Sequence, residues 1–472
     1  MDFEHLYING EWVPGSSGEW ISVEDPAAME IFARVPRGTP TDVDRAARAA
    51  HEALPAWAAL PLSERIALME KFLAIFRSQE EDIIELEIRE LGAPWSFAKS
   101  SHCEYQYTRV RSYIDLAPQV PLVEKMPLST VYREPVGVIG CITPWNYPLG
   151  QVVQKVIPAL LMGNTVVLKP SQHTPLSCFL MAEAFEKAGF PKGVFNMVTG
   201  RGGEVGDAMA SHPLIDMISF TGSTSGGIQV AQRALASVKR ISLELGGKSP
   251  ALVLPMENYD WAIRNCFNSI FLNSGQTCTA LSRLLIPKSD QAKIEEALVR
   301  IAAEYPVGDP HDHSVRVGPV ASAAQYKKIR GFIEQGIAGG ARVLLGGVPD
   351  EPDHGYYVKP TIFTDVTPDM AIAQAEIFGP VLCVFTYDTP EEAIRLANDT
   401  EYGLNAAVYG PKEEAIAAAR RIQAGNVYIN DSPRDTAAPF GGYKHSGIGR
   451  EGGVYGMLEF TQQKALFDTC KA

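Results

Sequence analysis

The sequence has no excess of positive charge and no long hydrophobic run. Its 42 Lys and Arg residues are outnumbered by 55 Asp and Glu residues, which gives a net charge of -13. A general nucleic-acid binder needs a basic face, so we expect no nucleic-acid partner. No apolar run is long enough to span a bilayer, and the opening "MDFEHLYINGEW" contains no hydrophobic signal region. We therefore expect a cytoplasmic protein without a membrane partner.

Cysteine is scarce and irregularly spaced. There are seven cysteines, an odd number, and no two of them form a CxxC pair. A disulfide framework usually shows an even number at regular spacings, and zinc sites usually show paired cysteines. The sequence therefore predicts neither a disulfide scaffold nor a bound metal.

What the sequence does contain is a repeated alternation of strand and helix patterns. The chain has 472 residues, of which 46% are hydrophobic and 21% charged, and this length suggests two or three domains. Short apolar runs bounded by Gly and Pro alternate with helical segments from about residue 136, and a second alternation begins near residue 250. This pattern predicts an α/β fold with mostly parallel sheets. Near the start, Asn9-Gly10 predicts a hairpin, and Thr41 is a candidate helix N-cap.

Two segments lie outside this alternation. Residues 118–135 have an extended pattern without a helical stripe, and the tail at 455–472 is strand-like. We expect them to form a separate small sheet, which would be a candidate for oligomerisation because exposed strands pair readily.

Polar residues follow two of the predicted strands at positions that suit acid–base chemistry. In open α/β sheets, ligands bind beyond the carboxyl ends of the strands. Asn146 in "TPWNYPLG" could donate to an oxyanion, although it could also be an ordinary residue of a proline-bounded turn. Glu244 in "ISLELGGKSP" could be a general base or, with about equal weight, the structural partner of an Arg or Lys.

Three further strand ends suit phosphate or ribose groups. Lys169 and Gln172 in "KPSQ" could hold nucleotide hydroxyls or phosphate, although a Lys after a strand is more often on the surface. Gly203 belongs to "TGRGGEVG", which is a weak match to a phosphate-binding turn. Ser223 in "TGSTSGG" opens a helix and suits a pyrophosphate, although serines also cap helices routinely.

Cys278 in "NSGQTCTALSR" has an unusual setting for a cysteine. A structural cysteine is normally surrounded by apolar residues, whereas this one lies between Thr277 and Thr279, shortly after Gly275. It follows a helix-forming run, so we expect neighbouring amide donors to favour its thiolate. The sequence therefore makes Cys278 a candidate nucleophile.

Taken together, the motifs resemble those of the NAD(P)-dependent aldehyde dehydrogenase superfamily. They are "TPWNYPL", "VVLKPS", "SFTGST", "LELGGKSP", "GQTC", "EIFGPV" and "PFGGYKHSG", and they occur in the family's order and at its spacing. The resemblance implies an α/β fold with three parts. These are a Rossmann-type cofactor domain at 1–117 and 136–246, an α/β catalytic domain at 247–454, and a small β oligomerisation element at 118–135 and 455–472. It also implies a homodimer or homotetramer.

The resemblance assigns roles to individual residues. Cys278 would be the nucleophile, Asn146 would hold the oxyanion together with the backbone N–H of Cys278, and Glu244 would be the general base. The cofactor would be NAD, and no metal would take part. Residues at the positions that the family uses for the cofactor are Trp145, Lys169, Ser171, Gln172, Gly203, Ser223, Gly246, Glu376 and Phe378.

The implied reaction is oxidation of an aldehyde to a carboxylic acid. A thiohemiacetal on Cys278 would lose hydride to NAD(P)+, and water activated by Glu244 would hydrolyse the resulting thioester. Two relatives of the same fold are alternatives, a CoA-acylating semialdehyde dehydrogenase and a non-catalytic structural protein. Glu244 disfavours the first, and intact Cys278, Glu244 and Asn146 disfavour the second. A redox-sensing thiol protein would leave the strand-end motifs unexplained.

The sequence departs from the family pattern in two places. Many NAD-preferring members have a glutamate after "KPS", whereas this chain has Gln172, so we expect NADP to be tolerated. The expected substrate pocket is of mixed polarity, which predicts a polar or hydroxylated aldehyde. Its expected members are Tyr147, Gln151, Gln154, Asn268, Leu272, Thr277, Thr279 and Phe440. Arg434 and Asp435 could add charge selection at its mouth, or could be plain loop residues.

Overall fold

The first sheet of the protein contains eight strands with a parallel centre. The computed structural model describes residues 3–467. The strand order is β2-β1-β9-β8-β7-β10-β11-β21, and the five strands from β9 to β11 in this order are parallel. The strands are β1 (Leu6–Ile8), β2 (Glu11–Val13), β7 (Val138–Ile142), β8 (Thr165–Lys169), β9 (Phe195–Met197), β10 (Met217–Thr221), β11 (Arg240–Glu244) and β21 (Gly447–Ile448).

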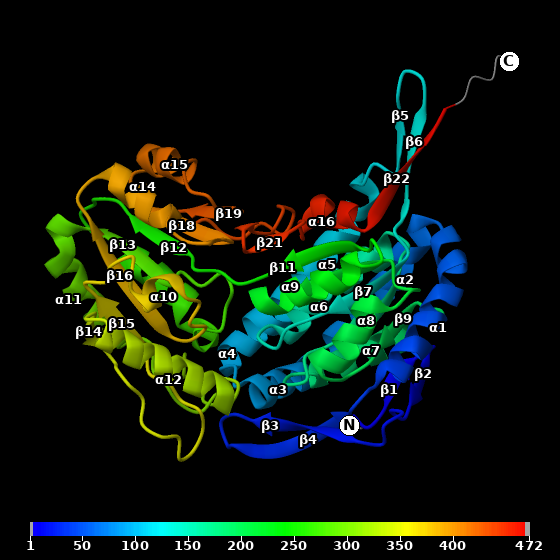
Figure 1. Cartoon of the computed structure of the whole chain (residues 1–472), viewed down its shortest axis with the longest axis horizontal. Coiled ribbons are helices and arrows are strands. Elements are labelled where there is room, and N and C mark those ends of the chain that lie inside the picture. Colours follow the sequence, from blue (N-terminus) through cyan, green and yellow to red (C-terminus); the bar gives the residue numbers. More distant parts are fainter. Residues whose placement is uncertain (1–2, 468–472) are drawn as a thin grey trace.

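The second sheet contains seven strands, in the order β14-β15-β16-β13-β12-β18-β19. All its pairs are parallel except β14 with β15. The strands are β12 (Pro250–Val253), β13 (Arg283–Pro287), β14 (Arg342–Leu345), β15 (Thr361–Thr364), β16 (Val381–Tyr387), β18 (Asn405–Tyr409) and β19 (Asn426–Ile429). The two alternations in the sequence thus correspond to two separate sheets, which Figure 1 shows on opposite sides of the molecule.

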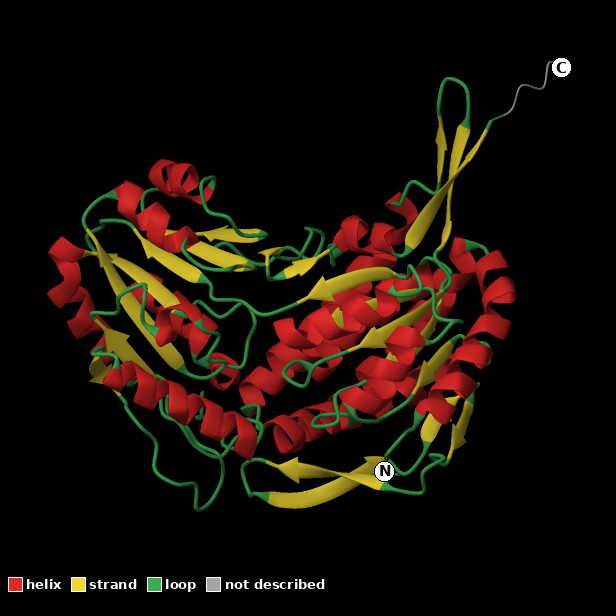
Figure 2. Cartoon of the chain, viewed as in Figure 1, coloured by secondary structure: helices red, strands yellow, loops and turns green. Residues whose placement is uncertain are grey.

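Helices cover both faces of each sheet (Figure 2). Those around the first sheet are α1 (Pro40–Ala59), α2 (Leu62–Ser78), α3 (Glu80–Leu91), α4 (Trp95–Phe97), η1 (Ala98–Glu104), α5 (Tyr105–Leu116), η2 (Ala117–Gln119), α6 (Pro148–Leu161), α7 (Leu176–Ala188), η3 (Gly202–Gly206), α8 (Asp207–Ser211), α9 (Thr224–Leu235) and α16 (Gly453–Glu459). Those around the second are α10 (Asp260–Ile270), η4 (Leu272–Gly275), η5 (Lys288–Asp290), α11 (Gln291–Ala302), α12 (Ala323–Ala338), α13 (Ala371–Gln374), α14 (Pro390–Asn398) and α15 (Lys412–Ala419).

Buried apolar side chains fill the space between these layers. Helices α5, α6 and α7 pack on one face of the first sheet, and α1, α8 and α9 pack on the other. The second sheet is covered by α12, α14 and α15 on one face and by α10 and α11 on the other. Because both faces are covered, most strands are continuously apolar, as the short hydrophobic runs in the sequence indicate.

The remaining strands form three small sheets. β3 (Trp20–Asp25) pairs with β4 (Glu30–Pro36), and β17 (Tyr402–Gly403) pairs with β20 (Tyr443–Lys444). β5 (Val123–Lys125), β6 (Thr130–Pro135) and β22 (Thr461–Leu466) form a three-stranded antiparallel sheet. This last sheet, which we call the arm, protrudes from the body of the molecule (Figure 1).

Several local predictions can be compared with these elements. The hairpin at Asn9-Gly10 is confirmed, with β1 and β2 antiparallel and both turn residues at positive φ. The predicted N-cap Thr41 is wrong, because Thr39 caps α1 and forms a capping box with Asp42. The tail is strand only in part. Residues 453–459 form α16, since their apolar residues pack against α5 and α6, and residues 468–472 lie outside the described residues.

The first sheet also recruits a strand from the far end of the chain. β21, at residues 447–448, pairs antiparallel with β11, although the sequence places it in the second domain. The chain therefore returns to the first sheet before residue 454. This return carries the "PFGGYKHSG" segment to the carboxyl end of β11, where Glu244 lies.

Candidate active site

Cys278 lies where two cavities meet. Six cysteines fall within the described residues, none of them in a disulfide, and Cys278 is the only one of the six that is not buried. It lines a cavity of about 260 Å³, which we call the substrate cavity, and a second cavity of about 200 Å³, which we call the cofactor cavity. A sulfur in this position can contact a molecule in either cavity.

The loop that presents Cys278 has a tightly constrained backbone. Asn273, Ser274 and Gly275 have positive φ values of 52°, 52° and 73°. A Cβ on Gly275 would lie 2.1 Å from the backbone of Gly379, so no larger residue fits there. Such backbone strain persists only where the surroundings hold it in place.

Side chains fix the same loop from several directions. The Ser274 hydroxyl donates to the Gly318 carbonyl at 2.8 Å, and the Gln276 side-chain oxygen accepts from the backbone N–H of Ala321 at 2.8 Å. The Asn273 amide donates to the Asn146 carbonyl at 2.8 Å. These bonds tie the cysteine loop to residues that are far away in the sequence.

Asn146 lies beside this loop, immediately after β7. Its side-chain nitrogen donates to the Gln276 carbonyl at 2.9 Å, and the residue is buried. An asparagine amide has two N–H donors, so one remains for another acceptor. Asn146 and Cys278 both line the cofactor cavity. The structure therefore brings together the predicted nucleophile and the predicted oxyanion donor.

Glu244 is a buried carboxylic acid at the end of β11. Neither of its carboxylate oxygens has a hydrogen-bond partner among residues 3–467. Burial, followed by the nearby Glu451 carboxylate, raises the pKa of Glu244 well above its ordinary value, against the opposing effect of Lys155. The alternative of a structural ion pair is not seen, because Lys155 pairs with Glu451 instead. Raised carboxyl pKa values without structural partners are typical of acid–base sites.

The surroundings of Cys278 also shift the pKa of its thiol. Burial raises its pKa to about 12, and the carboxylates of Glu376 and Glu244 add to this effect. Arg434 and the backbone N–H of Cys278 lower the pKa but do not compensate. The direction of this shift is opposite to the expected lowering of the pKa, because desolvation of the partly exposed thiol outweighs the amide donor.

The cofactor cavity contains most of the predicted cofactor residues. It is lined by Trp145, Asn146, Ser223, Gly246, Cys278, Glu376 and Phe378 together with Pro144, Thr221, Gly222, Leu245, Gln325 and Lys328. Ser223 is the N-cap of α9, and its hydroxyl accepts from the backbone N–H of Gly226 at 3.1 Å. Helix N-termini bind phosphate readily. The rings of Trp145 and Phe378 pack edge to face, with 5.3 Å between the ring centres.

Glu376 is held close to the backbone that follows β11. Its carboxylate accepts from the Gly247 N–H at 3.0 Å. A Cβ on Gly247 would lie 2.3 Å from the Cys278 carbonyl oxygen, so the absence of a side chain allows this segment to touch the cysteine loop. The "LGGKSP" motif thus lies next to Glu244, to the cysteine loop and to the Glu376 carboxylate, which lines the cofactor cavity.

Four predicted cofactor residues lie outside this cavity. Lys169 ends β8, is buried, and donates to the Pro170 carbonyl at 2.8 Å; burial lowers its pKa to about 8. Ser171 and Gln172 follow in the same turn. Gly203 is exposed at the start of η3, with nothing within 4 Å of its Cβ position. A Cβ on Gly206 would instead lie 3.8 Å from the Lys169 side chain, so it is Gly206 and not Gly203 that lies next to the lysine.

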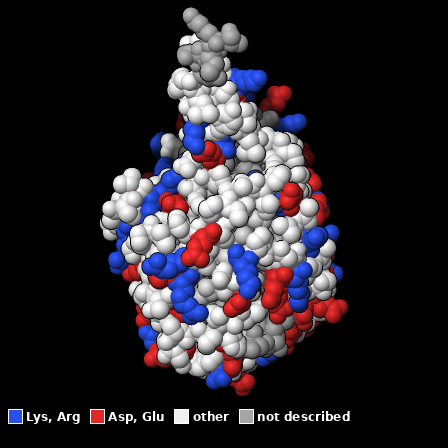
Figure 3. All heavy atoms as spheres, turned by 90° about the vertical axis from the view of Figure 1, so that its right-hand side faces the viewer, with Lys and Arg blue, Asp and Glu red and all other residues white. Residues whose placement is uncertain are grey.

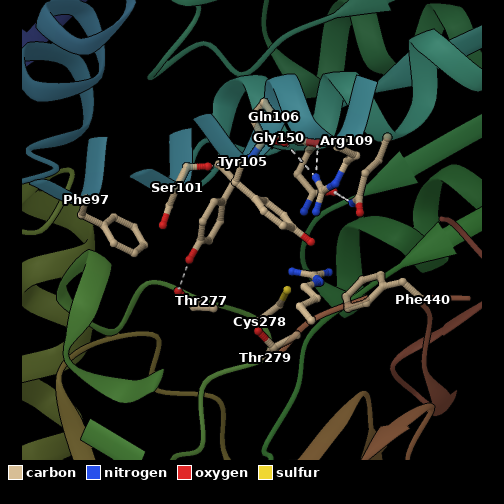
Figure 4. A pocket seen from close by; sticks show the side chains of 14 residues that line it. Phe97, Ser101, Tyr105, Gln106, Arg109, Gly150, Thr277, Cys278, Thr279 and Phe440 are labelled. Atoms are coloured by element: carbon tan, nitrogen blue, oxygen red, sulfur yellow. Dashed lines mark hydrogen bonds between the residues drawn. The ribbon is translucent and has the colours of Figure 1, made fainter. Parts of the chain in front are cut away.

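The substrate cavity lies on the other side of Cys278 (Figure 4). Cys278, Thr277 and Thr279 form one wall, and Tyr105, Gln106 and Arg109 face them from α5. The predicted residues that line it are Tyr147, Gln151, Gln154, Thr277, Thr279 and Phe440, joined by Arg434. Sequence reasoning missed Phe97, Ser101, Tyr105, Gln106, Arg109 and Gly150. The α4–α5 residues among them carry no motif, and only the packing of α5 on α6 brings them here.

Two predicted pocket residues are not in this cavity. Asn268 lies on the exposed side of α10, where its side-chain oxygen accepts from the Tyr305 hydroxyl at 2.7 Å and from Arg316 at 2.9 Å. Leu272 begins η4 and does not line the cavity. The prediction is wrong for both residues, since neither lines the cavity and the side chain of Asn268 is bound to Tyr305 and Arg316.

The polar residues of α6 are held by a buried network. The Gln154 amide donates to the Glu451 carboxylate at 2.8 Å and to the Gln151 side-chain oxygen at 3.3 Å. Thr221 also donates to Gln151, at 3.3 Å. Tyr147 and Thr277 share a hydrogen bond at 2.9 Å. Gln151 and Gln154 are therefore buried and do not form a solvated helix face.

Among residues 3–467, no group of three or more His, Cys, Asp or Glu side chains is arranged to hold a metal ion. No helix in the same range is both long enough and apolar enough to cross a membrane.

The fold and the site together define a class of α/β proteins in which one cysteine separates a dinucleotide-type cavity from a second, mixed-polarity cavity. The model of the family described as "Aldehyde dehydrogenase family" matches residues 12–466. The chain therefore belongs to the aldehyde dehydrogenase family.

Relatives in sequence and structure cover almost the whole chain. The 3-succinoylsemialdehyde-pyridine dehydrogenase of a Pseudomonas species is 40% identical over 469 residues, which is 98% of each chain. A crystal structure of a cysteine-to-alanine mutant of aldehyde dehydrogenase C from Pseudomonas syringae, with NAD+ and octanal, is 41% identical with a TM-score of 0.97, covering 100% of this chain and 98% of that one. An aldehyde dehydrogenase from Mycobacterium tuberculosis, crystallised with NAD+, is 38% identical with a TM-score of 0.97, covering 100% and 99%.

Proposed function

We propose that this protein oxidises an aldehyde to the carboxylic acid with NAD+, and that Cys278 is the nucleophile. The observation that carries the proposal is that Cys278 belongs to both cavities. An aldehyde in one cavity and a dinucleotide in the other would meet at its sulfur. Positioning of two reactants around one atom supplies much of the rate enhancement in such reactions.

The chain's own residues account for the covalent steps. The Cys278 thiol releases its proton to solvent, and the thiolate sulfur then bonds to the carbonyl carbon and forms a thiohemiacetal alkoxide. The free N–H of the Asn146 amide and the Cys278 backbone N–H stabilise this oxyanion, and losing one such donor typically costs about 3 kcal/mol. NAD+, which Trp145, Ser223 and Glu376 would hold, supplies the acceptor for the hydride that leaves the carbon. A thioester on Cys278 remains.

Glu244 completes the reaction by activating water. Its buried carboxyl has no other hydrogen-bond partner and a raised pKa, so it can take a proton from water once it is ionised. The water oxygen attacks the thioester carbon, and the cysteine sulfur leaves with the proton. The presence of this base supports hydrolysis over acyl transfer to CoA.

The test is a kinetic comparison of three forms of the enzyme with simple aldehydes and NAD+. Wild type should produce NADH and free acid without CoA. Cys278→Ala should produce no NADH. Glu244→Gln should release one equivalent of NADH per site in a burst and then turn over about 10²- to 10⁴-fold more slowly. A requirement for CoA would favour the acylating alternative, and NADH formation by Cys278→Ala would overturn the role of the cysteine.

The arm supports a proposal about assembly. Its exposed apolar residues are Val123, Met126, Leu128, Tyr132, Leu466 and Phe467. Figure 3 shows a largely uncharged surface toward the top of the molecule, above a region of mixed acidic and basic side chains. A protruding sheet of this kind gains stability when another subunit covers it. We propose that the protein associates through this arm into a homodimer or homotetramer.

A further inference from the structure

Two positive charges line the substrate cavity. Within the described part of the chain, Arg109 and Arg434 are the only charged residues in its wall. Neither guanidinium forms an ion pair with any Asp or Glu among residues 3–467. Arg109 is buried, whereas Arg434 is exposed on its loop. A charged group at a buried position is normally paired, so the absence of an acidic partner for Arg109 requires an explanation.

Arg109 is the more deeply placed of the two. Only 7% of its surface is exposed, and its Nη1 donates to the Gln106 side-chain oxygen and to the Gly150 carbonyl, each at 3.0 Å. Both acceptors are neutral. A guanidinium has five N–H donors, so these two bonds leave donors available to a ligand.

Arg434 reaches the cavity from the loop before "PFGG". Its guanidinium lies 4.8 Å from the ring centre of Phe440 and 5.7 Å from that of Tyr105. The guanidinium of Arg109 lies 4.8 Å from the same Tyr105 ring. Stacking on aromatic faces orients a guanidinium without neutralising it. The two cations therefore flank one tyrosine, and both remain uncompensated.

Three carboxylates near the substrate cavity form no ion pair with either arginine. Glu451 binds Lys155 and Gln154. Asp435 accepts from the Ala437 backbone N–H at 2.8 Å, and Asp431 lines a neighbouring cavity without pairing with Arg434. Glu244, whose pKa Arg434 helps to lower, does not line this cavity. An anionic group on a molecule that enters the cavity would therefore give Arg109 the counter-charge that its own surroundings lack.

We infer that the substrate is an aldehyde that carries a carboxylate at its far end, with the carboxylate bound by Arg434 and Arg109 while the aldehyde carbon lies against the Cys278 sulfur. This inference rests on the proposed function and names its substrate class. A guanidinium can bind a carboxylate through two parallel hydrogen bonds, which fixes orientation as well as charge. The cavity, at about 260 Å³, has room for a chain of a few carbons.

The experiment compares aldehydes of equal length that differ in one terminal group. The substrates are butanal and succinic semialdehyde, measured with NAD+ for wild type, Arg434→Gln, Arg434→Lys and the distant exposed control Arg420→Gln. Wild type should prefer succinic semialdehyde at least tenfold in kcat/KM. In Arg434→Gln, kcat/KM for the semialdehyde should fall roughly 10- to 100-fold more than for butanal, mainly through KM. Arg434→Lys should retain part of the preference, and Arg420→Gln should match wild type.

A comparison of two substrates separates carboxylate binding from an effect on the nucleophile. Arg434 also lowers the pKa of Cys278, and losing that influence would slow both aldehydes equally. Equal kcat/KM values for the two aldehydes in wild type, or equal losses in Arg434→Gln, would overturn the inference while leaving aldehyde oxidation intact. If no aldehyde yields NADH, the proposed function fails. Calorimetric titration with butyrate and butyramide then tests the cavity alone, and no preference for the carboxylate would overturn the inference.

Discussion

Glu244 illustrates how a single residue can be placed for chemistry at the expense of stability. A carboxyl group buried without a hydrogen-bond partner destabilises the folded protein when it is charged. Lys155 could have neutralised it but pairs with Glu451. The raised pKa of Glu244 means that the folded protein keeps the carboxyl proton to a higher pH than the unfolded chain does.

The raised pKa of Glu244 leads to a prediction about how the stability of the folded protein depends on pH. Because the folded-state pKa is raised, the penalty from Glu244 is absent at acidic pH and appears as pH rises above the ordinary carboxyl value. We expect Glu244→Gln to melt at a higher temperature than wild type at pH 8, and the difference to shrink toward pH 5. Differential scanning fluorimetry across this range measures it. A difference that grows toward acidic pH would contradict the assigned protonation state.

Gln172 is a second single residue with a consequence for function, because it affects the choice between NAD+ and NADP+. It follows the buried Lys169 by three positions and carries no negative charge that would repel a 2'-phosphate. We expect wild type to use NADP+ as well as NAD+. Gln172→Glu should lower kcat/KM for NADP+ at least tenfold and change that for NAD+ little, with Gln172→Ala as the neutral control. Strict use of NAD+ by wild type, unchanged in Gln172→Glu, would refute this selectivity.

At the scale of elements, the cysteine loop between η4 and β13 depends on one glycine. Gly275 has a φ of 73° and would place a Cβ 2.1 Å from the Gly379 backbone. We expect Gly275→Ala to lower the melting temperature and to reduce kcat/KM at least 100-fold, because the loop must move to relieve the clash and Cys278 moves with it.

The matched control is Gly189→Ala at the end of α7. Gly189 has a φ of 83°, but nothing lies within 4 Å of its Cβ position. Both variants carry the left-handed strain of about 1–2 kcal/mol, and only Gly275→Ala adds the backbone clash. Equal effects of the two substitutions on activity would show that the packing of the loop against Gly379 does not matter.

Elements differ in how far local sequence controls them. The β1–β2 hairpin follows from Asn9-Gly10, because that turn needs positive φ at both residues. The sequence predicts that α1 starts at Thr41, whereas Thr39 completes the capping box with Asp42. The short apolar pattern of α16 is compatible with strand or helix, and its contacts with α5 and α6 favour the helix.

At the scale of the whole molecule, the arm is the feature that a single chain leaves uncovered. Leu128 at its tip is 82% exposed. We expect wild type to sediment as a dimer or tetramer at micromolar concentration, and Leu128→Asp to shift the distribution toward smaller species. Val299→Asp, at an exposed apolar position on α11, is the control and should leave the mass unchanged. A monomeric wild type would refute assembly through the arm.

The amino-acid sequence by itself determined the two α/β alternations and the residues at the strand ends. Apolar runs and glycine turns are local, and parallel pairing then brings the carboxyl ends of β7, β8, β10 and β11 to one edge, with Ile142 opposite Lys169 and Thr221 opposite Glu244. Cys278, Asn146 and Glu244 could therefore be predicted as candidates before any contact was known.

Only the tertiary structure decided which residues surround the sulfur on the substrate side. Arg109 and Tyr105 lie about 170 residues before Cys278 on a helix without a motif, and Asn268 lies only ten residues before it yet faces away. The physical reason is that side-chain direction depends on helix packing and on charge pairing across the fold. The raised pKa of Cys278 has a similar origin, because desolvation is a property of the assembled site and not of the residue's neighbours in sequence.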